Sequence, residues 1–165
     1  MTAFYKELTG NRGLAKKACM LARSYGGLQM YNWAAEHPDS VACLAGIYPV
    51  CNMPSWPGLT SASRAYGMTE EELAKQLKDH NPIDRLAPLA KAGVPIHHIH
   101  GDVDKLVPLD QNSALLAERY KALGGTITVD VKNGQGHNYW RGFFESETMA
   151  TFIIGDAKRA GESER

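Results

Sequence analysis

The stretch from Lys17 to Gly27 constrains the fold most strongly, because an apolar run ends there at a serine and continues into two glycines. Residues 18–22 are apolar without interruption, Ser24 follows, and a helical pattern begins after Gly27. This order predicts a strand, a sharp turn and a helix. A serine at such a turn projects its hydroxyl away from both flanking backbones, and small neighbours let the strand and the helix pass closely.

The five residues around Ser24 follow the motif G-x-S-x-G, with Ala22 in the place of the first glycine. That motif marks the turn of a nucleophilic serine. Serine next to glycine is also common in ordinary loops, so the motif gains weight only from the residues that follow later in the chain.

Size and charge limit the classes of protein to be considered. A chain of 165 residues forms one domain, residues 1–165, and buries about two-thirds of its unfolded surface. The 18 basic and 18 acidic residues balance, which argues against nucleic acid or an anionic membrane as a partner. No basic leader and no apolar stretch long enough to cross a bilayer is present, so we expect a cytoplasmic protein.

The three cysteines, Cys19, Cys43 and Cys51, are an odd number without metal-type spacing. Because two of them lie in apolar runs, we expect buried free thiols in a reducing compartment.

Strand and helix patterns alternate along the chain. The strands are expected at residues 18–22, 41–48, 94–100 and 126–131, and the helices at residues 4–14, 28–35, 69–79, 83–92, 112–123 and up to 154. Continuous apolar strands suit a parallel sheet that is covered on both sides. The fold class is therefore α/β, with a mostly parallel sheet of about four strands and helices on both faces.

Two segments depart from this alternation. Residues 49–81 contain many helix breakers, a capping box at Thr69 and Glu72, and the large side chains of Met53 and Trp56. This segment either covers a pocket as an insertion or is an ordinary crossover with an irregular start. Residues 155–165 are polar, and we expect a flexible tail there.

Ser24, Asp104 and His137 follow the first, third and fourth expected strands. Functional groups of a parallel sheet gather in the loops at the carboxyl ends of its strands, so these three side chains are expected to meet. A histidine that takes the serine proton, and a carboxylate that orients the histidine, together make a nucleophile for acyl transfer.

Further motifs strengthen this interpretation. Gly101, Asp104, Val107 and Pro108 form the pattern G-x-x-D-x-x-V-P, and a glycine directly precedes His137. With these motifs, residues 4–154 resemble the C-terminal part of an α/β-hydrolase of the esterase and peptidase kind, truncated at its N-terminal side. The resemblance implies catalysis by Ser24, Asp104 and His137, with no cofactor or metal, and an oxyanion hole that uses the backbone N–H of Tyr25.

Two alternatives remain for the acidic and histidine residues. Asp102 competes with Asp104 as the acid, although the spacing from Gly101 favours Asp104. His97, His98 and His100 together with Asp102 resemble a metal-ligand spacing, yet the next position holds valine instead of histidine. Histidines packed beneath helices are the other interpretation.

Met53, Trp56 and Trp140 are candidates for an apolar acyl pocket, or they belong to the core. We expect a serine esterase for small, short-chain esters. A peptidase of the prolyl-oligopeptidase type and a non-catalytic remnant of a hydrolase are the alternatives.

The chain departs from the resembled family in front of the nucleophile. Only 23 residues precede Ser24, whereas these hydrolases place several strands and the loop with a second oxyanion donor there. The first strand would then expose an apolar edge. We expect a homodimer or a higher homo-oligomer that covers this edge, unless the chain is a fragment.

Overall fold

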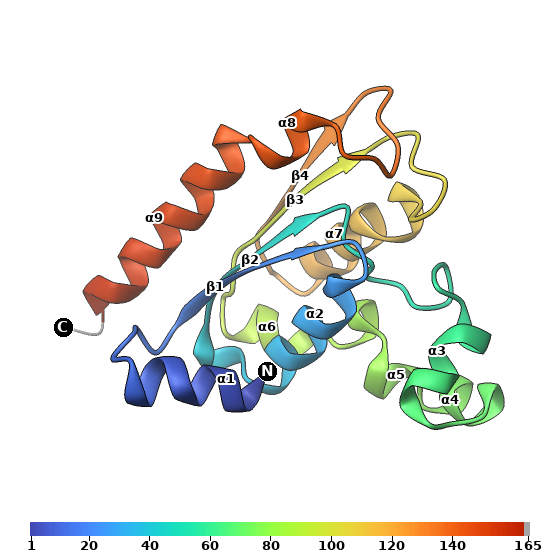
Figure 1. Ribbon diagram of the computed structural model, residues 1–165, viewed down its shortest axis with the longest axis horizontal. Coiled ribbons are helices and arrows are strands. Elements are labelled where there is room, and N and C mark those ends of the chain that lie inside the picture. Colours follow the sequence, from blue (N-terminus) through green and yellow to red (C-terminus); the bar gives the residue numbers. More distant parts are fainter. Residues whose placement is uncertain (164–165) are drawn as a thin grey trace.

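One parallel sheet organises the computed structural model, which describes residues 1–163. Its strands lie in the order β1-β2-β3-β4 (Figure 1). Their bounds are Ala18–Arg23, Val41–Ile47, Ile96–Gly101 and Ile127–Lys132. The expected α/β class, the number of strands and their parallel pairing are confirmed.

Helices cover both faces of the sheet, as expected. The crossovers α2 (Gly26–Glu36), α6 (Ala87–Lys91) and α7 (Ser113–Ala122) lie on one face (Figure 1). Right-handed crossovers that always advance in one direction place their helices on the same side of a sheet. Helix α9 (Glu147–Ser163) packs across the other face, after the short α8 (Arg141–Phe144).

The N-terminal segment packs against α2 and does not join the sheet. Helix α1 (Thr2–Lys6) continues into a π-helical turn over Glu7–Asn11. The rings of Tyr5 and Trp33 lie 5.4 Å apart, and the Trp33 indole N–H donates to the Thr2 hydroxyl at 3.0 Å. The segment therefore covers the outer side of α2.

The segment between β2 and α6 forms three short helices, α3 (Leu59–Tyr66), α4 (Glu70–Lys75) and α5 (Leu77–His80). The capping box of Thr69 and Glu72 opens α4, as predicted. The single helix expected over residues 69–79 is divided at Gln76. These helices share a buried apolar cluster with α2 that consists of Leu28, Val50, Met53, Ala62, Leu73 and Val107.

Three expectations need correction. The prediction of a flexible tail is wrong for residues 155–163, because α9 continues through them and buries Asp156 and Ala160. Residues 164 and 165 lie outside the described part. Strand β1 is not covered on both faces, since Leu21 is 56% exposed. The prediction of free thiols at Cys19 and Cys43 is also wrong. These residues face each other on neighbouring strands with Cα atoms 4.5 Å apart, and a disulfide joins them.

Cys51 is a free, buried thiol, as expected. Because Cys19 and Cys43 form a disulfide, the cysteines no longer support the prediction of a reducing compartment. Within residues 1–163, no helix is both long enough and apolar enough to span a bilayer.

Candidate active site

Ser24 occupies a strained turn between β1 and α2. Its φ angle is 49°, a left-handed conformation that side chains other than glycine rarely adopt. The Ser24 N–H donates to Ile47 O at 3.0 Å, and Val50 N–H donates to Ser24 O at 2.8 Å. A Cβ on Gly27 would lie 2.9 Å from Val50 N, so the small residue lets the two segments approach. The turn predicted from the sequence is therefore held on both sides by hydrogen bonds.

Asp104 lies in the loop after β3, and four donors surround its carboxylate. Oδ1 accepts from the N–H groups of Leu106 at 3.0 Å and Val107 at 2.9 Å. Oδ2 lies 2.8 Å from His137 Nδ1 and 3.5 Å from His100 Nε2. Burial alone would raise the pKa of Asp104, but these hydrogen bonds outweigh it and hold the pKa well below its usual range. The carboxylate is therefore ionised at neutral pH.

His137 connects Asp104 to Ser24. A carboxylate only accepts hydrogen bonds, so His137 Nδ1 carries the proton that faces Asp104. The other nitrogen, Nε2, is then an acceptor and lies 2.8 Å from Ser24 Oγ. The three side chains form one hydrogen-bonded series, which we call the Ser24–His137–Asp104 relay. This arrangement can move a proton from the serine hydroxyl to the imidazole.

Tyr48 is a site residue that sequence reasoning missed. It follows the last residue of β2, has a φ angle of 35°, and its ring centroid lies 4.3 Å from that of His137. Its hydroxyl donates to Asn138 O at 2.9 Å. Tyr48 therefore holds the loop that carries His137. Its only sequence signal is an aromatic residue at the carboxyl end of a buried strand.

A second contact on the same loop was also missed. The Arg23 guanidinium lies 4.7 Å from the ring centroid of Tyr139. Because Arg23 directly precedes Ser24, this contact links the nucleophile turn to the histidine loop.

Tyr25 directly follows Ser24 and caps the N-terminus of α2. Backbone N–H groups at a helix start have no acceptor within the helix, and none for Tyr25 is found in residues 1–163. The Tyr25 ring packs edge-on against Trp56 at a centroid distance of 5.4 Å. The N–H is thus available beside the nucleophile.

The structure separates the three candidates for the acyl pocket. Met53 is completely buried in the cluster beneath α3 and α4, so its side chain packs in the core and lines no accessible surface. Trp56 is partly buried against Tyr25, close to the nucleophile turn. Trp140 is 41% exposed and packs edge-on against Phe143 on the histidine loop side.

The alternatives to the relay take other positions. Asp102 is exposed and accepts from Gly134 N at 2.7 Å, so it supports the loop after β4 and does not face His137. His98 and His100 are buried on the α7 face of β3, whereas His97 packs on Phe152 of α9. No group of three or more His, Cys, Asp or Glu side chains within residues 1–163 is arranged to hold a metal ion.

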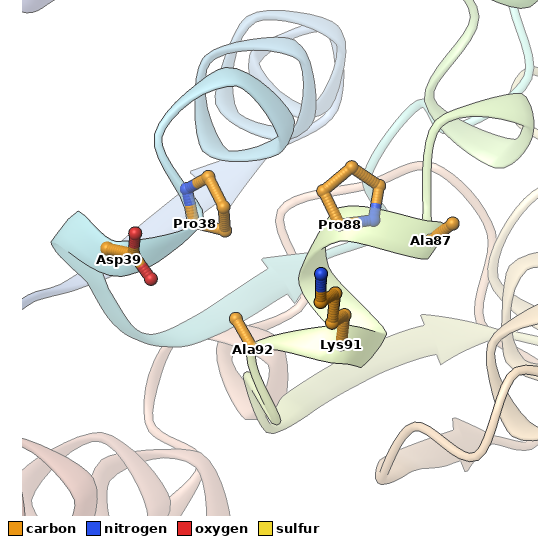
Figure 2. Close-up of a pocket in the computed structure, with 6 residues that line it drawn as sticks. All are labelled: Pro38, Asp39, Ala87, Pro88, Lys91 and Ala92. Carbon is orange, nitrogen blue, oxygen red and sulfur yellow. The ribbon is translucent and has the colours of Figure 1, made fainter.

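A cavity of about 230 Å³ beside α7 is lined by Asp104 of the relay and by Asp102. Two further cavities are lined by other residues. A cavity of about 600 Å³ is lined on one side by Pro38 and Asp39 and on the other by Ala87, Pro88, Lys91 and Ala92 (Figure 2). These residues precede β2 and β3, at the sheet end opposite Ser24. A cavity of about 250 Å³ lies between α2 and α3, next to Tyr25 and Tyr66.

Comparison with known proteins identifies the fold and the family. The family model described as "Prolyl oligopeptidase family" matches residues 7–153. No curated protein sequence matches the chain.

Solved structures with the same fold are similar at low sequence identity. Mycobacterium tuberculosis MPT51 is 18% identical with a TM-score of 0.73, and the match covers 93% of this chain and 66% of MPT51. Puromycin hydrolase is 21% identical with a TM-score of 0.68 and coverages of 93% and 24%. S-formylglutathione hydrolase from Agrobacterium tumefaciens is 17% identical with a TM-score of 0.66 and coverages of 94% and 57%. The chain therefore spans less than two-thirds of these proteins.

Proposed function

The chain belongs to the prolyl oligopeptidase family, and on this premise we propose that it is a serine hydrolase that cleaves small carboxylic esters through an acyl-enzyme on Ser24. The observation that supports the proposal is the Ser24–His137–Asp104 relay, whose two links both measure 2.8 Å.

The reaction follows from the donors and acceptors of the relay. Ser24 Oγ attacks the ester carbonyl while its proton passes to His137 Nε2, and the ionised Asp104 stabilises the imidazolium. The Tyr25 N–H donates to the oxyanion that forms. As the bond to the alcohol breaks, His137 returns the proton to the leaving oxygen. Water then attacks the acyl group by the same steps in reverse and releases the acid.

We expect esters to be favoured over amides, because the described residues place one oxyanion donor beside Ser24, the Tyr25 N–H. Loss of one of two such donors costs on the order of a hundredfold or more in rate. An ester tolerates this loss better, since an alkoxide leaves more readily than an amine. Trp56 packs against Tyr25 next to the nucleophile, and Trp140, three residues after His137, packs against Phe143. We propose that the two rings bind the apolar part of a short acyl group.

Hydrolysis of p-nitrophenyl acetate tests the proposal, with Ser24→Ala as the matched variant. We expect turnover by the wild-type chain and a loss of at least about a thousandfold in kcat for the variant. Unchanged turnover in the variant would show that the relay is idle and that the chain is a non-catalytic remnant.

A second candidate is a serine peptidase, which the family match favours. Comparison of p-nitrophenyl acetate with a proline p-nitroanilide distinguishes the two candidates. The ester proposal requires a clear preference for the acetate, whereas a higher kcat/KM for the anilide would favour the peptidase.

We also propose that the chain works as a homodimer or a higher homo-oligomer. Within residues 1–163, strand β1 lies at the end of the sheet and pairs with β2, and the apolar side chain of Leu21 is 56% exposed there. A second copy that packs on this edge would cover it and could bring a second oxyanion donor to Ser24.

A further inference from the structure

Behind Asp104 lies a continuous series of buried polar side chains that the reaction steps above do not use. The Tyr31 hydroxyl lies 2.6 Å from His98 Nε2, and His98 Nδ1 lies 2.9 Å from Ser113 Oγ. Ser113 Oγ lies 2.8 Å from His100 Nδ1. His98, His100 and Ser113 are fully buried, and Tyr31 is 1% exposed. We call this series the Tyr31–His98–Ser113–His100 chain.

With neutral imidazole rings, the donors and acceptors of this chain fit one pattern. His100 Nε2 lies 2.9 Å from Val107 O, and because a carbonyl only accepts, Nε2 carries the proton. His100 Nδ1 then accepts the Ser113 hydroxyl proton, and the Ser113 oxygen accepts from His98 Nδ1–H. His98 Nε2 in turn accepts from the Tyr31 hydroxyl. Every hydrogen bond therefore points toward His100, whose remaining N–H faces the loop of the catalytic acid.

His100 reaches that loop at two points. Its Nε2–H donates to Val107 O and also lies 3.5 Å from Asp104 Oδ2, beside the atom that accepts from His137. Val107 in turn donates its N–H to Asp104 Oδ1 at 2.9 Å. One imidazole thus fixes both the backbone that carries the carboxylate and the carboxylate itself.

We propose that His100, with its tautomer set by Ser113, His98 and Tyr31, is a positioning residue that holds the Asp104 carboxylate in register with His137. This inference rests on the proposed function, because positioning matters only if the relay is catalytic. A completely satisfied buried network rigidifies its surroundings, whereas a broken one leaves costly unpaired groups.

Burial favours the neutral form of His98 and of Tyr31. Burial, together with neighbouring His100 and His97, lowers the pKa of His98 to about 3. Burial also disfavours the charged form of Tyr31, and for a phenol this raises the pKa. Further titratable groups close to the chain and to Asp104 are Cys51 and Tyr120 beside Tyr31, and His137 and Tyr48 beside Asp104. A neutral His98 and a neutral Tyr31 keep their direction of hydrogen bonding across the pH range in which a histidine base works.

Two replacements of His100 separate positioning from packing. Glutamine can place an N–H near Nε2 and so keeps the donor toward Val107 and Asp104. Asparagine is shorter, keeps an acceptor for Ser113 and withdraws that donor. The matched control is His97→Asn, which removes a buried imidazole from the same strand but on the α9 face. Near-UV circular dichroism checks that each variant is folded.

The measurements are kcat and KM for p-nitrophenyl acetate, and the proton NMR signal of His137 Nδ1–H. A short bond to a carboxylate moves this signal far downfield and protects it from exchange. We expect His100→Asn to lose the signal and roughly ten- to a hundredfold in kcat, with little change in KM. His100→Gln should recover most of both, and His97→Asn should resemble the wild type.

Equal behaviour of His100→Asn and His97→Asn would overturn the inference, as would equal loss in the two folded His100 variants. If His100→Asn does not fold, Ser113→Ala decides. It leaves the ring volume unchanged, and we expect a severalfold loss of kcat and a weaker signal, whereas wild-type values would contradict positioning. A wild-type chain that shows the NMR signal without turnover would refute the proposed function. The positioning of Asp104 by His100 would then be tested by the effect of the His100 variants on the NMR signal.

Discussion

Replacement of Asp104 by asparagine tests the electrostatics of the relay most sharply. The side chain keeps its shape, but one of its two oxygens becomes an NH₂ group. In the wild type, Oδ1 accepts from two backbone N–H groups, and Oδ2 faces the ring nitrogens of His137 and His100. Either orientation of the amide therefore places its NH₂ group against two donors.

If the amide nitrogen faces His137, it donates to Nδ1 and favours the tautomer with the proton on Nε2. That nitrogen then cannot accept the Ser24 proton. We expect kcat for p-nitrophenyl acetate to fall about ten-thousandfold, or about 5 kcal/mol in the barrier. KM should change little, because Asp104 is buried and does not face the substrate.

The control for this variant is Asp102→Asn. Asp102 is exposed, and asparagine keeps the Oδ1 acceptor for Gly134 N, so kcat should stay within about twofold of the wild type. A loss of less than about tenfold in folded Asp104→Asn would refute the account of the relay. A larger loss of kcat in Asp102→Asn than in Asp104→Asn would show that Asp102, and not Asp104, is the acid of the relay.

Three further predictions concern the whole fold. In Gly101→Ala, the new Cβ would overlap the backbone carbonyl of Gln135, so both the stability in urea and kcat should fall. Wild-type values would contradict the close approach of β3 and the histidine loop. Because the pKa of Asp104 is depressed in the folded state, its contribution to stability is present above about pH 3.9 and is lost as the pH falls toward the folded value. Acid titration of Asp104→Asn should therefore show a smaller loss of unfolding free energy at low pH than the wild type, and equal losses would contradict this. Light scattering after size-exclusion chromatography should return at least a dimer, whereas a well-folded monomer at micromolar concentration would reject the covered β1 edge.

Most of the fold follows from local patterns in the sequence. The apolar runs before Ser24 and around Leu44 are long enough for buried strands, and the glycines and prolines between them mark the turns. The order of serine, acid and histidine after the first, third and fourth strands was enough to predict that Ser24, Asp104 and His137 meet, because parallel strands place these loops at one edge.

What the sequence did not show depends on register and on side-chain direction. The disulfide requires Cys19 to lie opposite Cys43, and the pattern of apolar residues does not fix the offset between two buried strands. Met53 lies in an irregular segment, where the sequence does not indicate that its side chain points inward.

Tyr48 and His100 were missed for a related reason. Their contacts with the relay depend on ring orientation across neighbouring loops and strands. The available signal for His100 was its place two residues after His98 on one strand face, directly before Gly101 of the acid motif.

Labelling with a fluorophosphonate probe, followed by mapping of the modified residue, tests the central claim most directly. The probe reacts only where a nucleophile, a base and an oxyanion donor act together. The relay predicts a single adduct on Ser24 that disappears in Ser24→Ala and is strongly slowed in Asp104→Asn. An unlabelled wild-type chain, or an adduct on another residue, would contradict it.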